Sequence, residues 1–269
     1  MFIVKVPGIN SSDGSTNGCE RSGEAVIKEL RKINTNEFGK EINVDALDIE
    51  EIHLDNSNLK LTEKLIYDNS LETFETKPKT VFLGGDGSIT FPVVKAFFDY
   101  CKNSGSEPRL IVFDAHADCK KPKEYPTYEE WLRKLVDSGF PARNILLVGA
   151  RNFGKDENSF IEDNKMKIVK INSITEDIHE TCDTIMEFSS GKELYVSIDA
   201  DVLDQNFAPS VPKPEIGGLT SREFLYIIQR INKIKNLRGI DIVGINMEKD
   251  KENKNITVKI GAKILSELI

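Results

Sequence analysis

The stretch Leu110-Ile-Val-Phe-Asp-Ala-His-Ala-Asp118 consists of four apolar residues followed by polar side chains at alternate positions. A second stretch, Leu194-Tyr-Val-Ser-Ile-Asp-Ala-Asp201, has a similar layout. Continuous apolar runs of this kind are typical of strands that are buried on both faces, as in a parallel sheet. Because alternate residues of an extended chain point to the same side, each predicted strand carries a row of polar groups at its carboxyl end.

Similar runs alternate with segments of helical spacing along the whole chain, which predicts a single three-layer α/β/α domain over residues 1–269 with about eight strands. Ser221 is expected to cap the helix that it begins. The predicted strands are Phe2–Val6, Ile42–Ile49, Thr80–Leu83, Leu110–Asp114, Ile145–Gly149, Lys167–Ile171, Leu194–Asp199 and Ile240–Ile245. The predicted helices are Glu20–Ile33, Leu59–Phe74, Ser88–Lys102, Tyr128–Ser138, Ile174–Phe188, Ser221–Ile234 and Ile256–Leu268.

The composition restricts the class of protein. Of the 269 residues, 39% are hydrophobic and 30% charged, which is typical of a globular chain rather than a disordered one. The net charge is −8, and the densest basic run, Lys120–Lys123, is too short for a nucleic-acid surface. No apolar run approaches the roughly 20 residues of a membrane helix, and Met1–Pro7 lacks the pattern of a cleaved signal peptide. The four cysteines form no CxxC pair, so we expect a cytoplasmic protein with reduced thiols and with neither nucleic acid nor membrane as a partner.

Polar residues at the two strand ends form the candidate functional site, because ligands of such sheets bind outside the carboxyl ends of the strands. Two carboxylates roughly 4 Å apart repel each other by about 4 kcal/mol at an effective dielectric constant of 20. A shared pocket therefore requires either raised pKa values or bound cations. Two divalent ions balance four aspartates, one imidazole among hard oxygens suits Mn²⁺, and a metal pair can activate water for hydrolysis. The predicted ligands are Asp114, His116, Asp118, Asp199 and Asp201.

Two other interpretations of these motifs are weaker. The segment 199–204 is similar to part of a calcium-binding loop, but it lacks a glycine at the sixth position, and Glu215 follows too late to be the twelfth. The glycine-rich turn Gly84–Ser88 lacks the lysine and the spacing of a phosphate-binding loop. A metal site at the strand ends therefore remains the preferred prediction.

Four segments resemble motifs of the ureohydrolase family, which comprises arginase, agmatinase and formimidoylglutamase: Gly84–Ser88, Asp114–Asp118, Ser197–Pro209 and Pro214–Thr220. The resemblance covers nearly the whole chain. It implies one arginase-like α/β/α domain with a mostly parallel eight-stranded sheet, assembled as a homo-oligomer. It also implies a two-manganese site that hydrolyses a C–N bond of a small cationic guanidine or amidine.

The same resemblance implies a role for each of the five predicted ligands. Asp114 and Asp199 would bridge the two Mn²⁺ ions, while His116 and Asp201 would complete one of them. Asp118 would bind the other ion and act catalytically by orienting the hydroxide nucleophile.

Several departures from the family pattern affect this site. Gly87 stands where the family has a sixth ligand, a histidine, so we expect one tight Mn²⁺ and a weakened second site. Gly244 stands where the family has a glutamate that pairs with the guanidinium. The proton-shuttling histidine is absent, and Tyr128 aligns loosely with its position. The pair Arg151-Asn152 lacks the acidic residue that follows in arginases, which argues against L-arginine as the substrate.

Two hypotheses remain open on this basis. The first is a hydrolase with a modified site and weak or altered activity. The second is a catalytically inactive, arginase-like metal-binding protein with a structural or regulatory role. A deacetylase of the same architecture is less favoured, because no tandem histidine pair is present. Residues that could replace the lost groups are His53, His179, Glu129, Glu130, Glu248 and Asp250, while Cys119 is expected to be a packed side chain.

Overall fold

The computed structural model describes residues 1–269 and contains one eight-stranded sheet in which every neighbouring pair of strands is parallel. The order across the sheet is β2-β1-β3-β8-β7-β4-β5-β6. The predicted sheet is thus confirmed, and it is wholly rather than mostly parallel. The strands are β1 (Phe2–Lys5), β2 (Asp48–Glu51), β3 (Thr80–Leu83), β4 (Pro108–Phe113), β5 (Ile145–Val148), β6 (Lys167–Val169), β7 (Glu193–Asp199) and β8 (Leu237–Val243).

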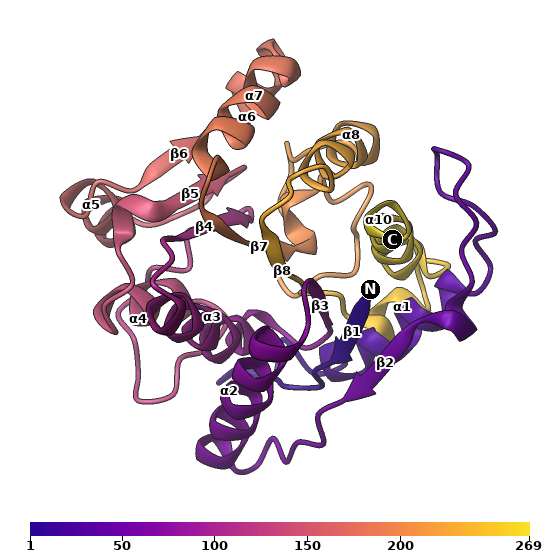
Figure 1. Ribbon diagram of the computed structural model, residues 1–269, viewed down its shortest axis with the longest axis horizontal. Helices are drawn as coiled ribbons and strands as arrows, with labels where there is room; N and C mark the ends of the chain where they lie inside the picture. Colours follow the sequence, from indigo (N-terminus) through magenta and orange to yellow (C-terminus); the bar gives the residue numbers. More distant parts are fainter.

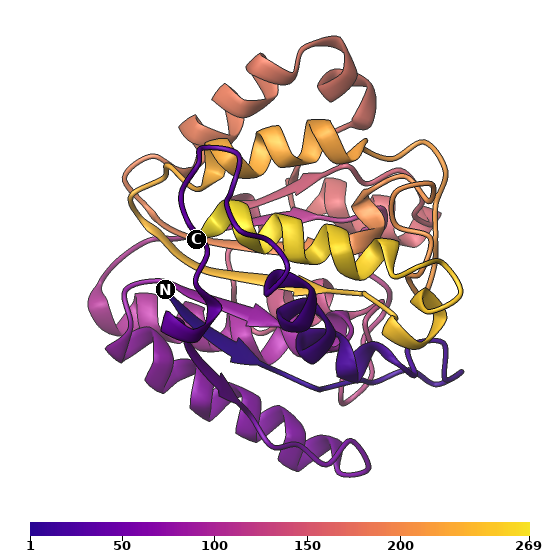
Figure 2. The ribbon, with the colours of Figure 1, turned by 90° about the vertical axis from the view of Figure 1, so that its right-hand side faces the viewer.

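Helices cover both faces of the sheet, which gives the three layers seen in Figures 1 and 2. One face carries α1 (Ser22–Leu30), α6 (Ile171–Glu176), α7 (Ile178–Ser189), α8 (Ser221–Ile231) and α10 (Ile256–Leu268). The other face carries α2 (Leu59–Thr76), α3 (Thr90–Ser104), α4 (Trp131–Asp137) and α5 (Lys155–Asp163). The shorter helical turns are η1 (Cys19–Arg21), η2 (Val44–Ala46), η3 (Gly87–Ile89), η4 (Ala142–Asn144), η5 (Ala200–Val202) and α9 (Met247–Asp250).

The two faces of the sheet bury two separate hydrophobic cores. Successive side chains of β4 alternate between them: Leu110 and Val112 pack under α2–α5, while Ile111 and Phe113 pack on the opposite side. Because both faces are covered, the four central positions Leu110–Phe113 are all apolar, and this explains the continuous run in the sequence. Polar groups stand at the two ends of this run, at Arg109 before it and at Asp114 and beyond after it.

The predicted strand Ile42–Ile49 is wrong in its position. Val44–Ala46 forms the turn η2, and the side chain of Asn43 accepts a hydrogen bond from the backbone N–H of Asp45 at its start. The strand β2 begins only at Asp48 and consists of mostly exposed, charged residues. Such residues are usual on an edge strand, where they discourage pairing with other chains, but they conceal the strand from a search for apolar runs.

Three helix predictions also need correction. The predicted helix Ile174–Phe188 is two helices, because Asp177 interrupts it and accepts hydrogen bonds from the first N–H groups of α7. Thr220, rather than Ser221, caps α8 through a reciprocal pair of bonds with Glu223. The helix α5 was not predicted from the sequence, because few of its residues are buried apolar ones.

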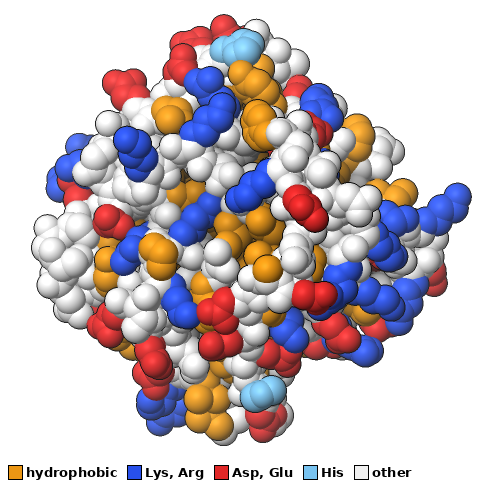
Figure 3. Space-filling model, turned by 45° about the vertical axis from the view of Figure 1, so that its right-hand side comes forward, with side chains coloured by type: hydrophobic (Ala, Val, Ile, Leu, Met, Phe, Trp, Pro, Cys, Tyr) orange, Lys and Arg blue, Asp and Glu red, His pale blue; other side chains and the backbone are white.

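No helix in the structure has both the length and the apolar character needed to span a bilayer. On the face drawn in Figure 3, basic and acidic side chains are interspersed over the surface. Ion pairs at the surface of the molecule include Arg222 with Glu37 and Arg133 with Asp156. Exposed pairs of this kind each contribute about 0–1 kcal/mol to stability, so the two cores account for most of it.

Candidate metal centre

A polar cavity of about 460 Å³ opens at the carboxyl ends of β4 and β7, which are neighbours in the middle of the sheet. Fifteen residues line it, only two of them hydrophobic, and all five predicted ligands are among the fifteen. The parallel arrangement is the reason, since it brings the ends of both strands to one edge of the sheet. The cavity therefore unites residues from two motifs that are about eighty positions apart in the chain.

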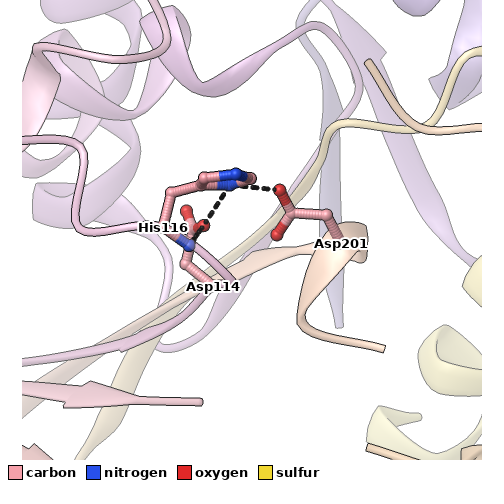
Figure 4. A group of neighbouring side chains, drawn as sticks. All are labelled: Asp114, His116 and Asp201. Carbon is pink, nitrogen blue, oxygen red and sulfur yellow. Dashed lines mark hydrogen bonds and ion pairs between the residues drawn. The ribbon is translucent and has the colours of Figure 1, made fainter. Parts of the chain in front are cut away.

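Three of the predicted ligands form a tight group. Potential metal-binding atoms of Asp114, His116 and Asp201 all lie within 4.8 Å of one another. The imidazole Nδ1 of His116 is 2.8 Å from Asp201 Oδ2 and 3.6 Å from Asp114 Oδ1 (Figure 4). The backbone N–H of Ala115 donates to Asp201 Oδ1 at 2.9 Å, so a direct bond joins the segments that follow β4 and β7.

Asp118 and Asp199 line the same cavity but lie outside this tight group. The buried indole N–H of Trp131, at the start of α4, donates to Asp118 Oδ2 at 2.8 Å. The backbone of Asp118 has a φ of 49°, in the left-handed region that is uncommon for a non-glycine residue. Asp199 Oδ1 accepts the backbone N–H of Asp201 at 2.9 Å. Both carboxylates are therefore held in place by the protein itself.

The electrostatics of the cluster favour a bound cation. Burial, followed by repulsion from neighbouring carboxylates, raises the pKa values of Asp114, Asp118 and Asp199 well above their ordinary range. Burial alone would lower the pKa of His116, but its hydrogen bonds to Asp114 and Asp201 raise that pKa to about 12. Hard carboxylate oxygens with one imidazole nitrogen suit a divalent ion such as Mn²⁺. The residues present therefore fit the cation that the sequence led us to expect.

His116 has a second partner, Glu215, that was not predicted from the sequence. Glu215 Oε1 lies 3.3 Å from His116 Nε2, and the side-chain amide of Asn152 donates to the same oxygen. The imidazole is thus held between a carboxylate at Nε2 and the aspartates at Nδ1. A carboxylate behind a ligating histidine fixes the orientation of the ring and raises its basicity. Glu215 falls within a motif that had been noted, but nothing local in the sequence indicated its contact with His116.

Two further residues brace the cavity. Arg151 donates from Nη2 to the backbone carbonyls of Asp201 and Glu215, at 2.9 and 3.0 Å, and so ties these two segments together. Glu157, on α5, accepts the N–H groups of Cys119 and Gly154 at 3.1 and 2.9 Å. Because α5 was not predicted, the role of Glu157 had no visible signal in the sequence.

The structure shows what surrounds Gly87 and Gly244, the two glycines that stand where the family pattern has a histidine and a glutamate. A Cβ atom at Gly87 would lie 3.3 Å from both the Cβ and the carbonyl oxygen of Tyr128, so Tyr128 crowds the expected ligand position. Gly244 has a φ of 76°, and a Cβ there would lie 2.3 Å from Asp199 Oδ1. A glutamate at position 244 would therefore clash with Asp199.

Of the residues considered as replacements, only Glu129 lines the cavity. His53 is almost fully exposed, and His179 bonds to the hydroxyl of Tyr226 at 2.9 Å. Cys119 is fully buried among hydrophobic residues, as expected of a packed side chain. The remaining candidates bond elsewhere: Glu130 to the N–H of Thr127, Glu248 to Arg21, and Asp250 to the N–H of Val258.

A parallel α/β sheet with a carboxylate–histidine cluster at the ends of two central strands defines a class of protein equipped to bind divalent cations. Within that class, residues 2–269 match the sequence model of the Arginase family. The chain belongs to the Arginase family.

Individual relatives agree with this assignment. An arginase of Staphylococcus aureus (strain MRSA252) is 28% identical over 252 residues, which are 84% of this chain and 81% of the relative. A formimidoylglutamase of Halobacterium salinarum is 28% identical over 233 residues, or 83% and 73% of the two chains. The crystal structure of formimidoylglutamase from Bacillus subtilis subsp. subtilis str. 168 superposes with a TM-score of 0.88, at 22% identity, over 99% of this chain and 85% of that one. At this identity the likeness concerns the fold alone.

Proposed function

We propose that this protein is a divalent-metal-dependent hydrolase that cleaves a C–N bond of a guanidine or amidine, with weak or altered activity. The observation that carries the proposal is the cluster of Asp114, His116 and Asp201 in a cavity that Asp118 and Asp199 also line. Family membership supports the reaction class, since relatives include arginases and formimidoylglutamases. Mn²⁺ is the proposed ion, because it suits this mixture of oxygen and nitrogen donors.

Each residue has an assigned task. Asp114, His116, Asp199 and Asp201 would hold one ion tightly, while Asp114, Asp118 and Asp199 would hold a second, weaker one. When bound, such an ion lowers the pKa of water and so supplies a nucleophile at neutral pH. Trp131 holds Asp118 by a hydrogen bond, so its carboxylate is already oriented to position the attacking water. Glu215 would keep the His116 ring in its binding orientation.

The second candidate is an inactive metal-binding protein with a structural or regulatory role. Gly87 brings no donor atom, and Tyr128 crowds the space beside it. No acidic side chain can occupy position 244 without displacing Asp199. These observations argue against tight binding of a second metal ion and of a guanidinium group. They do not affect the ligands of the first metal site.

Three broader features belong to the same proposal. The chain would act as a single arginase-like domain over residues 1–269 and would assemble as a homo-oligomer, as the family resemblance implies. Its location would be the cytoplasm. Its partner would be a small substrate, with no role proposed for nucleic acid or membrane.

Metal reconstitution distinguishes the two candidates. Protein stripped with a chelator is reloaded with Mn²⁺, and metal content is measured together with release of ammonia and urea from a panel of guanidines and formimidoyl amino acids. The hydrolase proposal expects metal-dependent release that is lost in Asp118→Asn and kept in Asp163→Asn, a surface control on α5. Metal binding without release favours the inactive protein, and a protein that binds no metal contradicts both.

A further inference from the structure

We propose that Asp241, a carboxylate buried inside the sheet, is a positioning residue of the metal centre. Through Ser197 and Ile198 it fixes the end of β7, where Asp199 occupies the last position of the strand. The inference rests on the metal site of the proposed function. It adds a residue in the middle of β8 that does not itself line the cavity.

Asp241 is a charged residue in an apolar environment. It is fully buried, and its partner Tyr195 belongs to the core under α2–α5. Its hydrogen-bond partners, from Tyr195, Ser197 and Ile198, are all neutral groups. Burial raises the pKa of Asp241 to about 6, so at pH 7 the group is ionised and can only accept hydrogen bonds. A buried charge without a neighbouring cation costs free energy, so core stability alone does not account for this carboxylate.

The two oxygens of Asp241 bind different parts of β7. Oδ1 accepts the hydroxyl of Ser197 at 2.7 Å and the backbone N–H of Ile198 at 3.3 Å. Oδ2 accepts the hydroxyl of Tyr195 at 2.9 Å. Ser197 and Ile198 directly precede Asp199, whereas Tyr195 lies four positions before it. The contacts of Oδ1 therefore act on the end of the strand that leads into the cavity.

The pleat of β7 explains how these contacts reach Asp199. Ser197 and Asp199 are alternate residues, so their side chains project from the same face of the sheet. Asp241 pairs with Ser197 across the sheet, and the next residue on that face of β8, Val243, pairs with Asp199. Asp241 thus stands one step before Asp199 on the same face. A shift of the backbone at Ser197 or Ile198 would displace Asp199 directly.

Further hydrogen bonds carry this positioning into the cluster. Asp199 Oδ1 accepts the backbone N–H of Asp201 at 2.9 Å, and Asp201 Oδ1 accepts that of Ala115 at 2.9 Å. Asp201 Oδ2 lies 2.8 Å from His116 Nδ1. An unbroken series of contacts thus runs from Asp241 to the tight group of predicted ligands. Because metal sites require ligand positions within roughly 0.5 Å, loosening the end of β7 should weaken metal binding.

A pair of variants separates the two sides of the carboxylate. Ser197→Ala and Tyr195→Phe each remove one hydroxyl that donates to Asp241, but only Ser197 adjoins the end of the strand. Calorimetric titration with Mn²⁺ should show about tenfold weaker binding to Ser197→Ala, the lower end of the range for residues that support metal ligands. Tyr195→Phe should bind Mn²⁺ within about twofold of the parent, although it should unfold at a lower urea concentration because Oδ2 loses its partner.

Two substitutions of Asp241 itself separate hydrogen bonding from charge. Asp241→Asn should keep the Mn²⁺ affinity within about threefold of the parent, because the amide oxygen can still accept from Ser197 while the amide NH₂ donates to the hydroxyl of Tyr195. Asp241→Ala should bind Mn²⁺ about tenfold or more weakly. The electron paramagnetic resonance signal of bound Mn²⁺ reports the geometry of its ligands. Among these four variants it should change only in Asp241→Ala and Ser197→Ala.

Ser189→Ala is the matched control for the loss of a buried hydroxyl. Ser189 is also buried, but its hydroxyl donates to the carbonyl of Met186 near the end of α7. The variant should leave the Mn²⁺ affinity and the resonance signal unchanged. Should Asp241→Ala fail to fold, the comparison of Ser197→Ala with Tyr195→Phe decides the inference.

Four results would overturn the inference. They are parent-like Mn²⁺ binding by Ser197→Ala, an equal or larger loss of affinity in Tyr195→Phe, an equal loss in Asp241→Asn and Asp241→Ala, and an unchanged resonance signal in all variants. The parent protein scores the proposed function separately. If the parent binds Mn²⁺ and releases ammonia or urea while Ser197→Ala binds Mn²⁺ equally well, only the inference falls. A parent that binds no metal contradicts both.

Discussion

At the scale of single residues, Gly244 shows how tightly the aspartate cluster is built into the backbone. It follows β8 directly, its φ is 76°, and its α-carbon faces the carboxylate of Asp199. A glycine at this position allows the backbone to approach a predicted metal ligand more closely than any other residue would. The departure from the family pattern at position 244 is therefore also a packing requirement of the present site.

The variant Gly244→Ala should be destabilised by about 2–4 kcal/mol, because a positive φ costs roughly 1 kcal/mol and overpacking adds about 1–3 kcal/mol. It should also bind Mn²⁺ less tightly, since Asp199 must move. Gly39→Ala is the matched control: Gly39 has a similar φ of 78° but no heavy atom within 4 Å of the added Cβ. Urea unfolding of both variants separates the two contributions, and an equal loss in both would contradict a clash at Asp199.

Gly87 tests whether the second metal site can be repaired. Its φ is not in the left-handed region, so a side chain is tolerated by the backbone, but the imidazole must compete with Tyr128 for space. We expect Gly87→His to gain little metal by itself. The double variant with Tyr128→Gly should gain more, because glycine lacks the Cβ that lies 3.3 Å from the added atom. Metal analysis of both variants and of Tyr128→Gly alone checks this. A second ion in the single variant would show that Tyr128 moves aside readily.

At the scale of secondary-structure elements, the ends of helices and strands decide where the functional groups stand. Each predicted ligand lies within a few residues of the end of β4 or β7, and Trp131 begins α4 with its N–H on Asp118. The loop after β7 ends at α8, whose start is set by Thr220 and Glu223. Correct termination of these elements is therefore as important to the site as the ligands themselves.

The capping of α8 can be tested by a pair of neighbouring substitutions. Thr220→Ala removes the hydroxyl that accepts the N–H of Glu223 and should cost about 1 kcal/mol. Ser221→Ala changes the residue that the sequence pattern suggested as the cap and should be close to neutral. Thermal and urea unfolding of the two variants distinguish these assignments. A larger loss for Ser221→Ala would mean that the helix begins one residue later.

At the scale of the whole molecule, side chains from distant parts of the chain join elements that lie on the same face of the sheet. Glu37, in the loop after α1, receives two hydrogen bonds from Arg222 on α8 at 2.7 and 2.9 Å, and a third from Gln229 at 2.9 Å. The hydrogen bonds from Arg222, with those from Gln229, lower the pKa of Glu37 to about 2, against an ordinary 4.5. Glu37 thus links segments that are almost two hundred residues apart.

This link predicts a particular dependence of stability on pH. Because the folded-state pKa of Glu37 is depressed, its contribution is fully present above about pH 4.5 and is lost as the pH falls towards 2. Arg222 is exposed, so solvent screening limits the contribution to less than about 1 kcal/mol. Glu37→Gln should therefore be less stable than the parent at pH 7, with a smaller difference at pH 3. Urea unfolding midpoints of Glu37→Gln and of the parent protein, measured at both pH values, test this. A difference between the two proteins that grows on acidification would contradict it.

The amino-acid sequence by itself determined the parallel sheet and the position of the aspartate–histidine cluster. Both follow from local patterns: apolar runs of four or more residues mark strands covered on both faces, and polar residues at alternate positions mark the ends of those strands. Glu20–Ile33 and Ile256–Leu268 were similarly visible as helices, because their apolar spacing follows the helical period. Apolar spacing did not locate β2 and α5, because most residues of these two elements are polar.

Only the tertiary structure decided what surrounds the cluster. Glu215 stands behind His116 although 99 positions separate them, Lys213 pairs with Glu129 over 84 positions, and Tyr128 covers Gly87. The left-handed conformation of Gly244 and its contact with Asp199 likewise depend on how β8 and β7 pair. Contacts of this kind leave no period or spacing in the sequence, because each one depends on where separate loops meet at the sheet edge. The sequence thus determined which groups could bind a metal, and the fold decided which charges and side chains a substrate would meet beside it.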